Sequence, residues 1–306
     1  MKLGNTVALA TLIALCSSTA LNSALAQPTL KGGTAPAANA TATPTVKPAD
    51  MEAVDPRATA LATGQPETQP QADNPDKDAA AKTLAVAVPS ALPKPFKATY
   101  KTRLYGINLT ATRELKQQED GRWFLRFDID SWVAELKERS WFEWNSEGHA
   151  LTHRYEYHRS GLAPDRDVVI AFNWDKHRVV NSLNSEEDWS MTIPDGTLDK
   201  LNATMQIRAD LINGRKELSY DVADGGKLKN FSFSIEREET IKTPVGELDT
   251  VVIKTIRKKK SRETYTYFAK DWDYVLVRIS QKEPNGDSAS VDIQEGWVDG
   301  TKIVGR

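Results

Sequence analysis

The sequence predicts a mostly β domain: a large curled antiparallel sheet, half-barrel or barrel-like in form, with one covering α-helix. The 8 Trp, 8 Tyr and 8 Phe residues all lie between Phe96 and Trp297, so the aromatic side chains that can build a core are confined to this part of the chain. Apolar and polar residues alternate there with a period of two, which is typical of half-buried strands. A single stretch departs from that period and has the spacing of a helix.

The strands are expected in a meander that begins at Phe96. From Phe96 to Leu104 apolar and polar residues alternate, which predicts the first strand. A turn at residues 105–106, a strand over 107–115, a hairpin turn at 119–121 and a strand over 123–129 follow. Further strands are expected at 141–144, 151–158, 168–174, 218–222, 231–235, 248–256, 264–268, 274–280 and 289–293. This predicts a sheet of ten or more strands, and a sheet of that size tends to curl.

The helix is expected between the sixth and seventh of these strands. Its apolar residues are spaced +3, +4, +4 and +3, at Leu198, Leu201, Met205, Ala209 and Ile212. This spacing predicts an amphipathic helix of about four turns. Asp195 or Thr197 is the expected N-cap, and Asn213-Gly214 the expected end. We expect the helix to pack on the concave side of the sheet or to plug it.

Residues 1–26 have the features of a secretory signal peptide. Lys2 precedes an apolar run from Thr6 to Cys16, and residues 24–26 form an Ala-Leu-Ala cleavage site. The run is shorter than the about 20 residues that span a bilayer, and lipid attachment at Cys16 is disfavoured because Leu15 is not small. The prediction is therefore an exported protein of the periplasm or cell envelope, with no transmembrane span after cleavage. Because Cys16 is the chain's one cysteine, the mature chain would have neither a disulfide nor a thiolate nucleophile.

Residues 27–95 are predicted to be a disordered tether rich in Pro, Ala and Thr. This segment holds 11 of the chain's 15 prolines and no aromatic residue. Such a composition cannot bury enough apolar surface to offset the entropy of ordering. The remaining residues, 96–306, are then a single mostly-β domain.

Composition and motifs exclude several classes of function. The net charge of −2 gives no basic excess for nucleic acid. The chain lacks the G-x-S-x-G and S-x-x-K motifs of nucleophilic enzymes, both phosphate-binding glycine loops, and the H-E-x-x-H zinc motif. We therefore predict no catalytic residue, no cofactor and no metal site, which favours a protein that is not an enzyme.

Two groups of polar residues could form a metal site or a glycosidase site, but their spacing disfavours both. On one strand His149 and His153 would lie roughly 13 Å apart, and His158 would face the other side, so one strand cannot chelate a metal with them. Asp128 and Asp130 would lie about 7 Å apart on one strand face, near the spacing of an inverting glycosidase. The alternation places both opposite the apolar face, which predicts solvent-facing residues. A polysaccharide hydrolase is accordingly the weakest hypothesis.

Aromatic and basic clusters have structural and functional interpretations. Trp132, Trp141 and Trp144 could stack on sugar rings, but large aromatic residues more often fill the core of a wide sheet. The second cluster lies between two predicted strands, at a hairpin tip, and consists of Arg257, Lys258, Lys259, Lys260 and Arg262. It could contact anionic lipid headgroups or phosphates, or simply protect a sheet edge as a solvated lysine cluster.

Several segments, in their order along the chain, resemble the bacterial exported family known as domain of unknown function 3108. They are Phe96–Tyr100, Tyr157–Leu162, Pro194–Asp199, Tyr220–Gly225 and Thr243–Gly246. The resemblance covers residues from about 93 to 297 and does not include the tether. It implies an envelope protein with a mostly β domain, and it brings no established reaction, substrate or catalytic residue.

The function that these observations favour is a binder or carrier of a lipid or other amphipathic molecule. The curled sheet and the helix would enclose an apolar cleft, lined by apolar residues near the helix at Phe127, Phe172, Met205 and Phe233. The alternative is a structural or interaction module, in which the tether lets the β domain reach a protein or glycan of the envelope.

Overall fold

The structure of the protein is a computed structural model that describes residues 90–104, 107–132, 134–161, 164–184, 187–257, 262–286 and 288–306. The predicted signal peptide and nearly all of the predicted tether lie outside these residues, so both remain predictions. The described strands are β1 (Phe96–Leu104), β2 (Ile107–Gln117), β3 (Trp123–Asp130), β4 (Ala134–Trp144), β5 (Ala150–Gly161), β6 (Arg166–Asn173), β7 (Arg178–Leu183), β8 (Glu187–Thr192), β9 (Leu218–Asp224), β10 (Lys227–Thr243), β11 (Gly246–Ile256), β12 (Glu263–Ala269), β13 (Val275–Lys282), β14 (Ser288–Val298) and β15 (Thr301–Lys302). The helices are α2 (Lys200–Ile212) and a short 3-10 helix, η1 (Lys270–Trp272).

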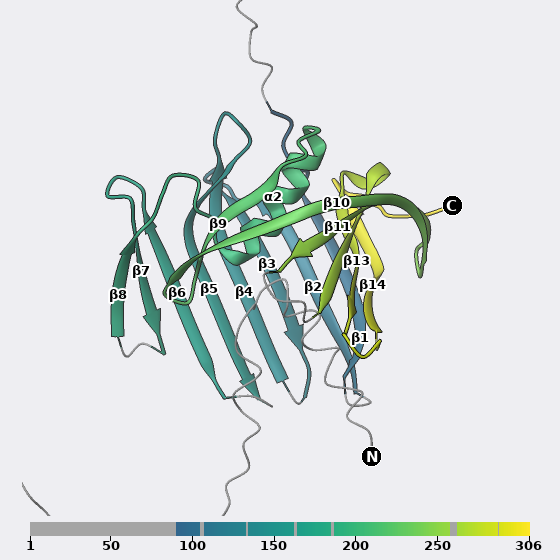
Figure 1. Ribbon diagram of the computed structural model, residues 1–306, viewed down its shortest axis with the longest axis horizontal. Coiled ribbons are helices and arrows are strands. Elements are labelled where there is room, and N and C mark those ends of the chain that lie inside the picture. Colours follow the sequence, from purple (N-terminus) through teal and green to yellow (C-terminus); the bar gives the residue numbers. More distant parts are fainter. Residues whose placement is uncertain are drawn as a thin grey trace, which may run out of the picture. The chain divides into compact units, whose positions relative to one another are not determined.

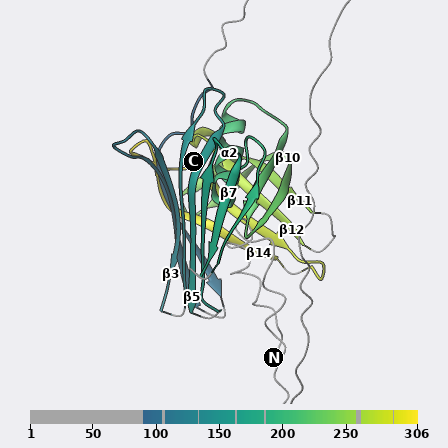
Figure 2. The same ribbon diagram turned by 90° about the vertical axis from the view of Figure 1, so that its left-hand side faces the viewer.

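The described strands form one antiparallel sheet. Its order is β8-β7-β6-β5-β4-β3-β2-β1-β14-β13-β12-β11-β10-β9, with β15 paired to β14. Apart from β8 and β9, the described strands β1–β14 pair with their neighbours in sequence, and the additional pairing of β1 with β14 joins the two meanders. We call β2–β8 the first wing and β9–β14 the second wing. Figures 1 and 2 show the wings curling toward each other, with α2 between them.

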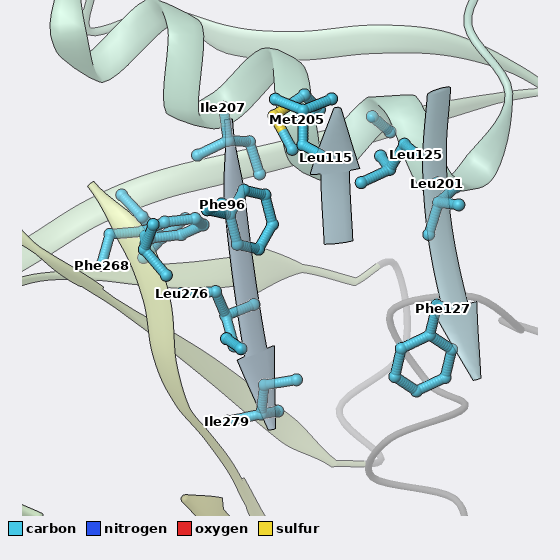
Figure 3. Close-up of a cluster of buried hydrophobic side chains, with 14 of the residues drawn as sticks. Phe96, Leu115, Leu125, Phe127, Leu201, Met205, Ile207, Phe268, Leu276 and Ile279 are labelled. Carbon is cyan, nitrogen blue, oxygen red and sulfur yellow. The ribbon is translucent and has the colours of Figure 1, made fainter. Parts of the chain in front are cut away.

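The core lies on the inner faces of the two wings. Alternation sets this face, as in β3, where Leu125, Phe127 and Ile129 are buried. Figure 3 shows Met205 of α2 beside Leu115 of β2, with Leu125 of β3 close by. A helix therefore plugs the concave side of a large curled sheet, as the sequence predicts, and the predicted fold class is confirmed.

Three details differ from the sequence prediction. The helix begins at Lys200 with Asp199 as its N-cap, so the predicted caps at Asp195 and Thr197 are wrong. Leu198 instead forms a parallel bridge with Val222 at the edge of β9. The helix is also buried on all sides rather than amphipathic. Finally, the sequence pattern does not predict β7 and β8, because each has only six residues.

Side chains connect the two outermost strands of the sheet, β8 and β9. β8 and β9 do not pair with each other among the described strands, which leaves the sheet open. Across this seam, the ring of Trp189 on β8 lies against Gly226 in the turn between β9 and β10. A Cβ atom on Gly226 would lie 2.1 Å from two ring carbons of Trp189. The side chain of Arg166 on β6 comes close to the neighbouring Gly225 in the same turn.

Candidate functional site

The helix brings polar side chains into the interior of the sheet. Residues Lys200 to Leu211 are all buried, although polar and apolar residues alternate along them. Residues two apart on a helix differ by about 200°, so this alternation places the polar side chains on two opposite sides of the helix. α2 packs against β3, β4 and β5 on one side and β9 on the other. The polar side chains inside the sheet are those of Lys200, Asn202, Thr204, Gln206, Arg208 and Asp210.

A hydrogen-bonded cluster fixes the N-terminus of α2 to the first wing. Asp199 Oδ1 accepts hydrogen bonds from the backbone N–H groups of Leu201 and Asn202, at 2.8 and 2.9 Å. Its Oδ2 accepts from the hydroxyls of Ser140 and Thr152, at 2.7 and 2.9 Å. Burial raises the pKa of the Asp199 carboxyl, although these hydrogen bonds act in the opposite direction. The cluster thus holds a buried carboxyl between β4, β5 and the helix.

Lys200 connects the helix to both wings. Its Nζ lies 3.2 Å from Asp224 Oδ1 on β9. The same ammonium group lies 5.1 Å from the ring centroid of Tyr157 and 5.8 Å from that of Tyr155, both on β5. The Tyr155 hydroxyl donates a hydrogen bond of 3.0 Å to Glu138 Oε2 on β4. Burial acts to raise the pKa of Asp224, but neighbouring lysine charges outweigh it and the pKa is lowered.

Arg208 and Asp210 connect the other end of α2 to the sheet. The Arg208 Nε donates to the backbone carbonyl of Asp273 at 2.6 Å, and its Nη2 donates to the Asp273 carboxylate. The guanidinium also lies 4.8 Å from the ring centroid of Phe96. Burial lowers the pKa of Arg208 to about 10, although Asp273 favours the charged form. Asp210 Oδ2 accepts a hydrogen bond of 2.6 Å from the Tyr220 hydroxyl on β9.

Asn181 on β7 is a buried amide without a hydrogen-bond partner. The side chain is 1% exposed, and within the described part of the chain neither its Oδ1 nor its Nδ2 has a hydrogen-bond partner. It faces the interior between Ile170 on β6 and Trp189 on β8, with which it is paired in register. A buried amide without partners costs about 1–3 kcal/mol. Its donor and acceptor are therefore available to a molecule that enters this part of the interior.

Two of the predicted ligand-binding residues lie near the helix. Met205 is fully inside the core, packed between α2 and the first wing. Phe127 lies on the inner face of β3, two residues beyond Leu125. Figure 3 shows the Phe127 ring farther from α2 than the Leu125 side chain. The apolar inner face of β3 therefore continues past the helix.

The other two predicted ligand-binding residues lie farther apart. Phe172 on β6 stacks on Trp174 with a centroid distance of 5.7 Å, at the border of the core. Phe233 on β10 lies 6.1 Å from the Tyr220 ring, in the second wing. All four predicted residues face the interior, but they are spread over β3, β6, α2 and β10.

The predicted basic cluster lies at the β11–β12 connection. Lys258, Lys259 and Lys260 are outside the described residues. Arg257 and Arg262, at the two ends of the connection, are each half-buried. The Arg262 Nη1 donates to Gln281 Oε1 at 3.2 Å, and Gln281 is buried on the inner face of β13. At least this arginine turns toward the interior rather than outward at a hairpin tip.

The histidines weighed as metal ligands lie in separate surroundings. His149 Nε2 is 2.9 Å from the carbonyl oxygen of Gly196. His153 lies 3.4 Å from Glu143, and His158 lies 2.6 Å from Asp167. In the part of the chain that the structure covers, no three His, Cys, Asp or Glu residues are grouped to hold a metal ion.

The carboxylates weighed as a glycosidase pair lie on the outer face of the first wing. Asp128 forms ion pairs with Arg139 at 2.5 Å and Arg126 at 3.4 Å. Asp130 is exposed. The predicted outer face is confirmed for both residues, but only Asp130 faces solvent freely, because the Asp128 side chain is 18% exposed.

The three tryptophans weighed as sugar platforms do not share a face. Trp132 is 85% exposed. Trp141 packs on Phe124 at a centroid distance of 5.1 Å, whereas Trp144 contacts Phe142, which is buried. Because strand alternation places Trp141 and Phe142 on opposite faces of β4, no common platform forms from these three residues.

Sequence reasoning missed the polar residues of the interior. The side chains that surround these polar residues come from strands far away in the sequence. This is the case for Asp199, Lys200 and Asn181. A signal was nevertheless present, because the alternation of polar and apolar residues from Lys200 to Leu211 cannot give a helix one polar face. Such a helix, if it forms, must bury part of its polar surface.

Among the described residues, no helix is long and apolar enough to cross a membrane.

Comparison with known protein families gives one match. The sequence profile of the family described as "Protein of unknown function (DUF3108)" matches residues 96–294. This span agrees with the predicted resemblance over about 93 to 297, which is confirmed. A search of curated proteins finds no match to the chain.

Three solved structures are similar at low sequence identity. A β-barrel-like protein of the DUF1849 family from Brucella abortus has a TM-score of 0.44 and 8% identity, over 67% of this chain and 98% of its own. A candidate lipoprotein from Parabacteroides distasonis has a TM-score of 0.27 and 13% identity, over 68% and 97% of the two chains. The MucA/MucB complex of Pseudomonas aeruginosa has a TM-score of 0.14 and 6% identity, over 65% and 87%.

Proposed function

This chain belongs to the family described as protein of unknown function (DUF3108), and we propose that it is an exported protein of the cell envelope that binds an amphipathic ligand, such as a lipid, inside its curled sheet. The binding part of the proposal rests on the interior of the sheet. The export part rests on the sequence of residues 1–26 and on the tether behind it. The protein would act as a binder or carrier and would not need a catalytic residue.

The observation that carries the proposal is the unpartnered amide of Asn181 among apolar side chains. Ile170, opposite it on β6, and Val179, two residues away on the same face, are both fully buried. An amide without partners in such surroundings lowers the stability of the fold, so stability does not account for its presence. A ligand that carries a polar group on its apolar body would satisfy the amide and keep contact with its neighbours.

The length of the apolar inner face also supports an amphipathic ligand. Along β3 it runs from Leu125 through Phe127 to Ile129, all buried. On the second wing, Leu276 and Ile279 of β13 face the same interior (Figure 3). An acyl chain between the wings would gain roughly 0.8 kcal/mol for each buried methylene group.

Binding of an apolar fluorescent probe tests this proposal. N-phenyl-1-naphthylamine is uncharged, and its emission rises in apolar surroundings. We expect the purified protein to raise the emission, and Phe127→Asn on the inner face of β3 to weaken the probe's affinity. Phe124→Asn is the matched control, because Phe124 lies on the outer face of the same strand, against Trp141. Thermal unfolding of both variants confirms that they are folded.

Absence of probe binding by the folded wild-type protein would contradict the proposal and favour the interaction module. That alternative predicts that deletion of the tether abolishes function in the cell. The deletion should end at residue 89, because the Ser90 hydroxyl donates to the carbonyl of Glu147 and the Ala91 N–H donates to Asn213 Oδ1, each at 2.9 Å. These bonds make residues 90 and 91 part of the β domain.

A further inference from the structure

Arg257 and Arg262 both lie on the inner face of the second wing. Ile253 of β11 pairs with Thr266 of β12, and both are buried in the interior. Strand alternation then places Arg257, four residues after Ile253, on the same face. Arg262 directly precedes β12 and lies four residues before Thr266, which again gives the inner face. The two guanidinium groups therefore approach the interior from neighbouring strands.

The contacts of the two arginines leave positive charge uncompensated. Arg262 donates to the neutral Gln281 amide at 3.2 Å, and its Nε lies 3.8 Å from a Glu283 carboxylate oxygen. The Arg257 Nε is buried and has no hydrogen-bond partner among the residues that the structure describes. Burial lowers the pKa of Arg257, and the positive charge of Arg262 lowers it further. Two guanidinium groups thus share one carboxylate at the edge of the interior.

Such an arrangement is unfavourable unless an anion completes it. A buried N–H of a charged group without an acceptor loses its hydration, and two like charges at close range repel each other. The cost is recovered when an anion accepts hydrogen bonds from both groups, since guanidinium is the preferred partner of phosphate and carboxylate. The positions and charges of Arg257 and Arg262 fit this chemistry, because two guanidinium groups lie beside one carboxylate at the edge of the interior.

We propose that Arg257 and Arg262 bind the anionic headgroup, a phosphate or a carboxylate, of the amphipathic ligand held inside the sheet. This inference rests on the proposed function and specifies the chemical class of its ligand. The site lies at the end of the interior away from α2. Figure 3 shows Ile279 farther from the helix than Leu276, and Gln281, the partner of Arg262, lies two residues further along β13. The apolar body of the ligand would then extend toward the helix.

Two probes with the same apolar chain test the proposal. Dodecyl phosphate carries an anionic headgroup, and dodecyl maltoside carries an uncharged one. Isothermal titration of each probe, below its micelle concentration, is carried out with the wild-type protein and with Arg257→Gln and Arg262→Gln. Arg237→Gln is the matched control, because Arg237 lies on β10 of the same wing and is paired with Glu239 at the surface. Inorganic phosphate is titrated as a third ligand.

We expect the wild-type protein to prefer dodecyl phosphate, and each inner-face variant to lose about tenfold or more in affinity for it, as for a hydrogen bond to a charged group. The affinity for dodecyl maltoside should change less than about twofold, and the control should behave as wild type. Equal binding of dodecyl phosphate by the wild type and both variants would overturn the anion site alone. Binding of inorganic phosphate that depends on both arginines, with no gain from the dodecyl chain, would support the anion site and contradict the amphipathic ligand. If none of the three ligands binds, both proposals are wrong.

Thermal unfolding of the same variants gives an independent measurement. Arg257→Gln removes one of two like charges and a buried N–H without an acceptor, so its Tm should equal or exceed that of the wild type. A clear loss of stability would instead assign Arg257 a structural role and overturn the proposal.

Discussion

The indole ring of Trp189 lies so close to Gly226 that a Cβ atom at residue 226 would stand 2.1 Å from two of its carbons. Trp189 belongs to β8 and Gly226 to the turn after β9, so this contact joins the two ends of the strand order. Beside it, Asp224 at the end of β9 pairs with Lys200 of the helix at 3.2 Å. Side chains thus connect the wings at the seam where the backbone pairing stops.

Gly226→Ala should open this seam and destabilise the domain. The new methyl group cannot coexist with the present position of Trp189, and overpacking of this kind costs about 1–3 kcal/mol. The φ of +87° at Gly226 adds about 1 kcal/mol for any residue with a Cβ. Urea denaturation monitored by tryptophan fluorescence measures the loss.

Gly286→Ala is the matched control for that experiment. Gly286 has a similar φ of +90°, but a Cβ there would meet no atom within 4 Å. The difference between the two variants therefore reports the contact with Trp189 alone. Equal losses of stability at both positions would mean that the seam contact contributes nothing. In the Gly226→Ala variant, a second substitution of Trp189 by Ala should relieve the strain.

Asp199→Asn should change how the stability of the domain depends on pH. Burial raises the pKa of Asp199 in the folded protein above its ordinary value of 3.8. The folded state then binds more protons than the unfolded chain over this interval, so the group's contribution to stability is complete below 3.8 and is lost as the pH rises through the raised pKa. Denaturant titrations between acidic and neutral pH should show this decline in the wild type and a flatter profile in the variant.

Asp120→Asn provides the contrast for this pH profile. Asp120 is exposed and its pKa is lowered, chiefly by the hydrogen bond from the Arg122 side chain. Its contribution has the opposite sign, because it is present at higher pH and is lost as the pH falls. An unchanged slope in Asp199→Asn would mean that the buried carboxyl does not titrate with folding.

The two substitutions that break the Arg208–Asp273 ion pair should lower the stability of the domain by different amounts. Asp273→Asn leaves a guanidinium that is 2% exposed without its counter-charge, and we expect a cost of about 3 kcal/mol. Asn also tolerates the φ of +53° at this position. Arg208→Met leaves a carboxylate that is 18% exposed and still accepts the Lys94 N–H, so it should cost less. Urea denaturation that gives the reverse order would contradict this account of the pair.

Asn181→Leu should stabilise the domain and weaken ligand binding at the same time. The substitution keeps the volume and removes a buried amide without partners, a gain of about 1–3 kcal/mol. Affinity for N-phenyl-1-naphthylamine, which lacks a polar head, should persist, whereas dodecyl maltoside, whose sugar hydroxyls can pair with the amide, should bind more weakly. Asn230→Leu serves as the control, because Asn230 is exposed and already hydrogen-bonded to Ser232. A destabilised Asn181→Leu would show that the amide has a structural role.

The local pattern of the sequence predicts much of this fold. The two-residue period predicts most strands between Phe96 and Ile293, and the spacing from Leu201 to Ile212 predicts the helix. The pattern does not predict β7 and β8, because these short strands have few apolar residues in alternation. The start of the helix was also misplaced, because Leu198 is drawn into a bridge with Val222, a contact that no local pattern encodes.

The candidate site is less accessible to sequence reasoning. The aromatic and apolar residues of the interior, such as Phe127, follow from strand alternation alone. The contacts of the polar groups do not follow from alternation. The neighbours of Asn181 lie on β6 and β8, and those of Lys200 lie on β5 and β9. Alternation from Thr266 places Arg262 on the inner face, but no local pattern indicates its hydrogen bond to Gln281 on another strand.

Native mass spectrometry of the protein, purified without detergent from its own host, tests the central claim most directly. The account predicts a stoichiometric adduct with the mass of an anionic amphipathic molecule, reduced in Arg257→Gln and in Asn181→Leu. A folded protein that carries no adduct, under conditions in which a known lipid carrier keeps its cargo, would contradict the account.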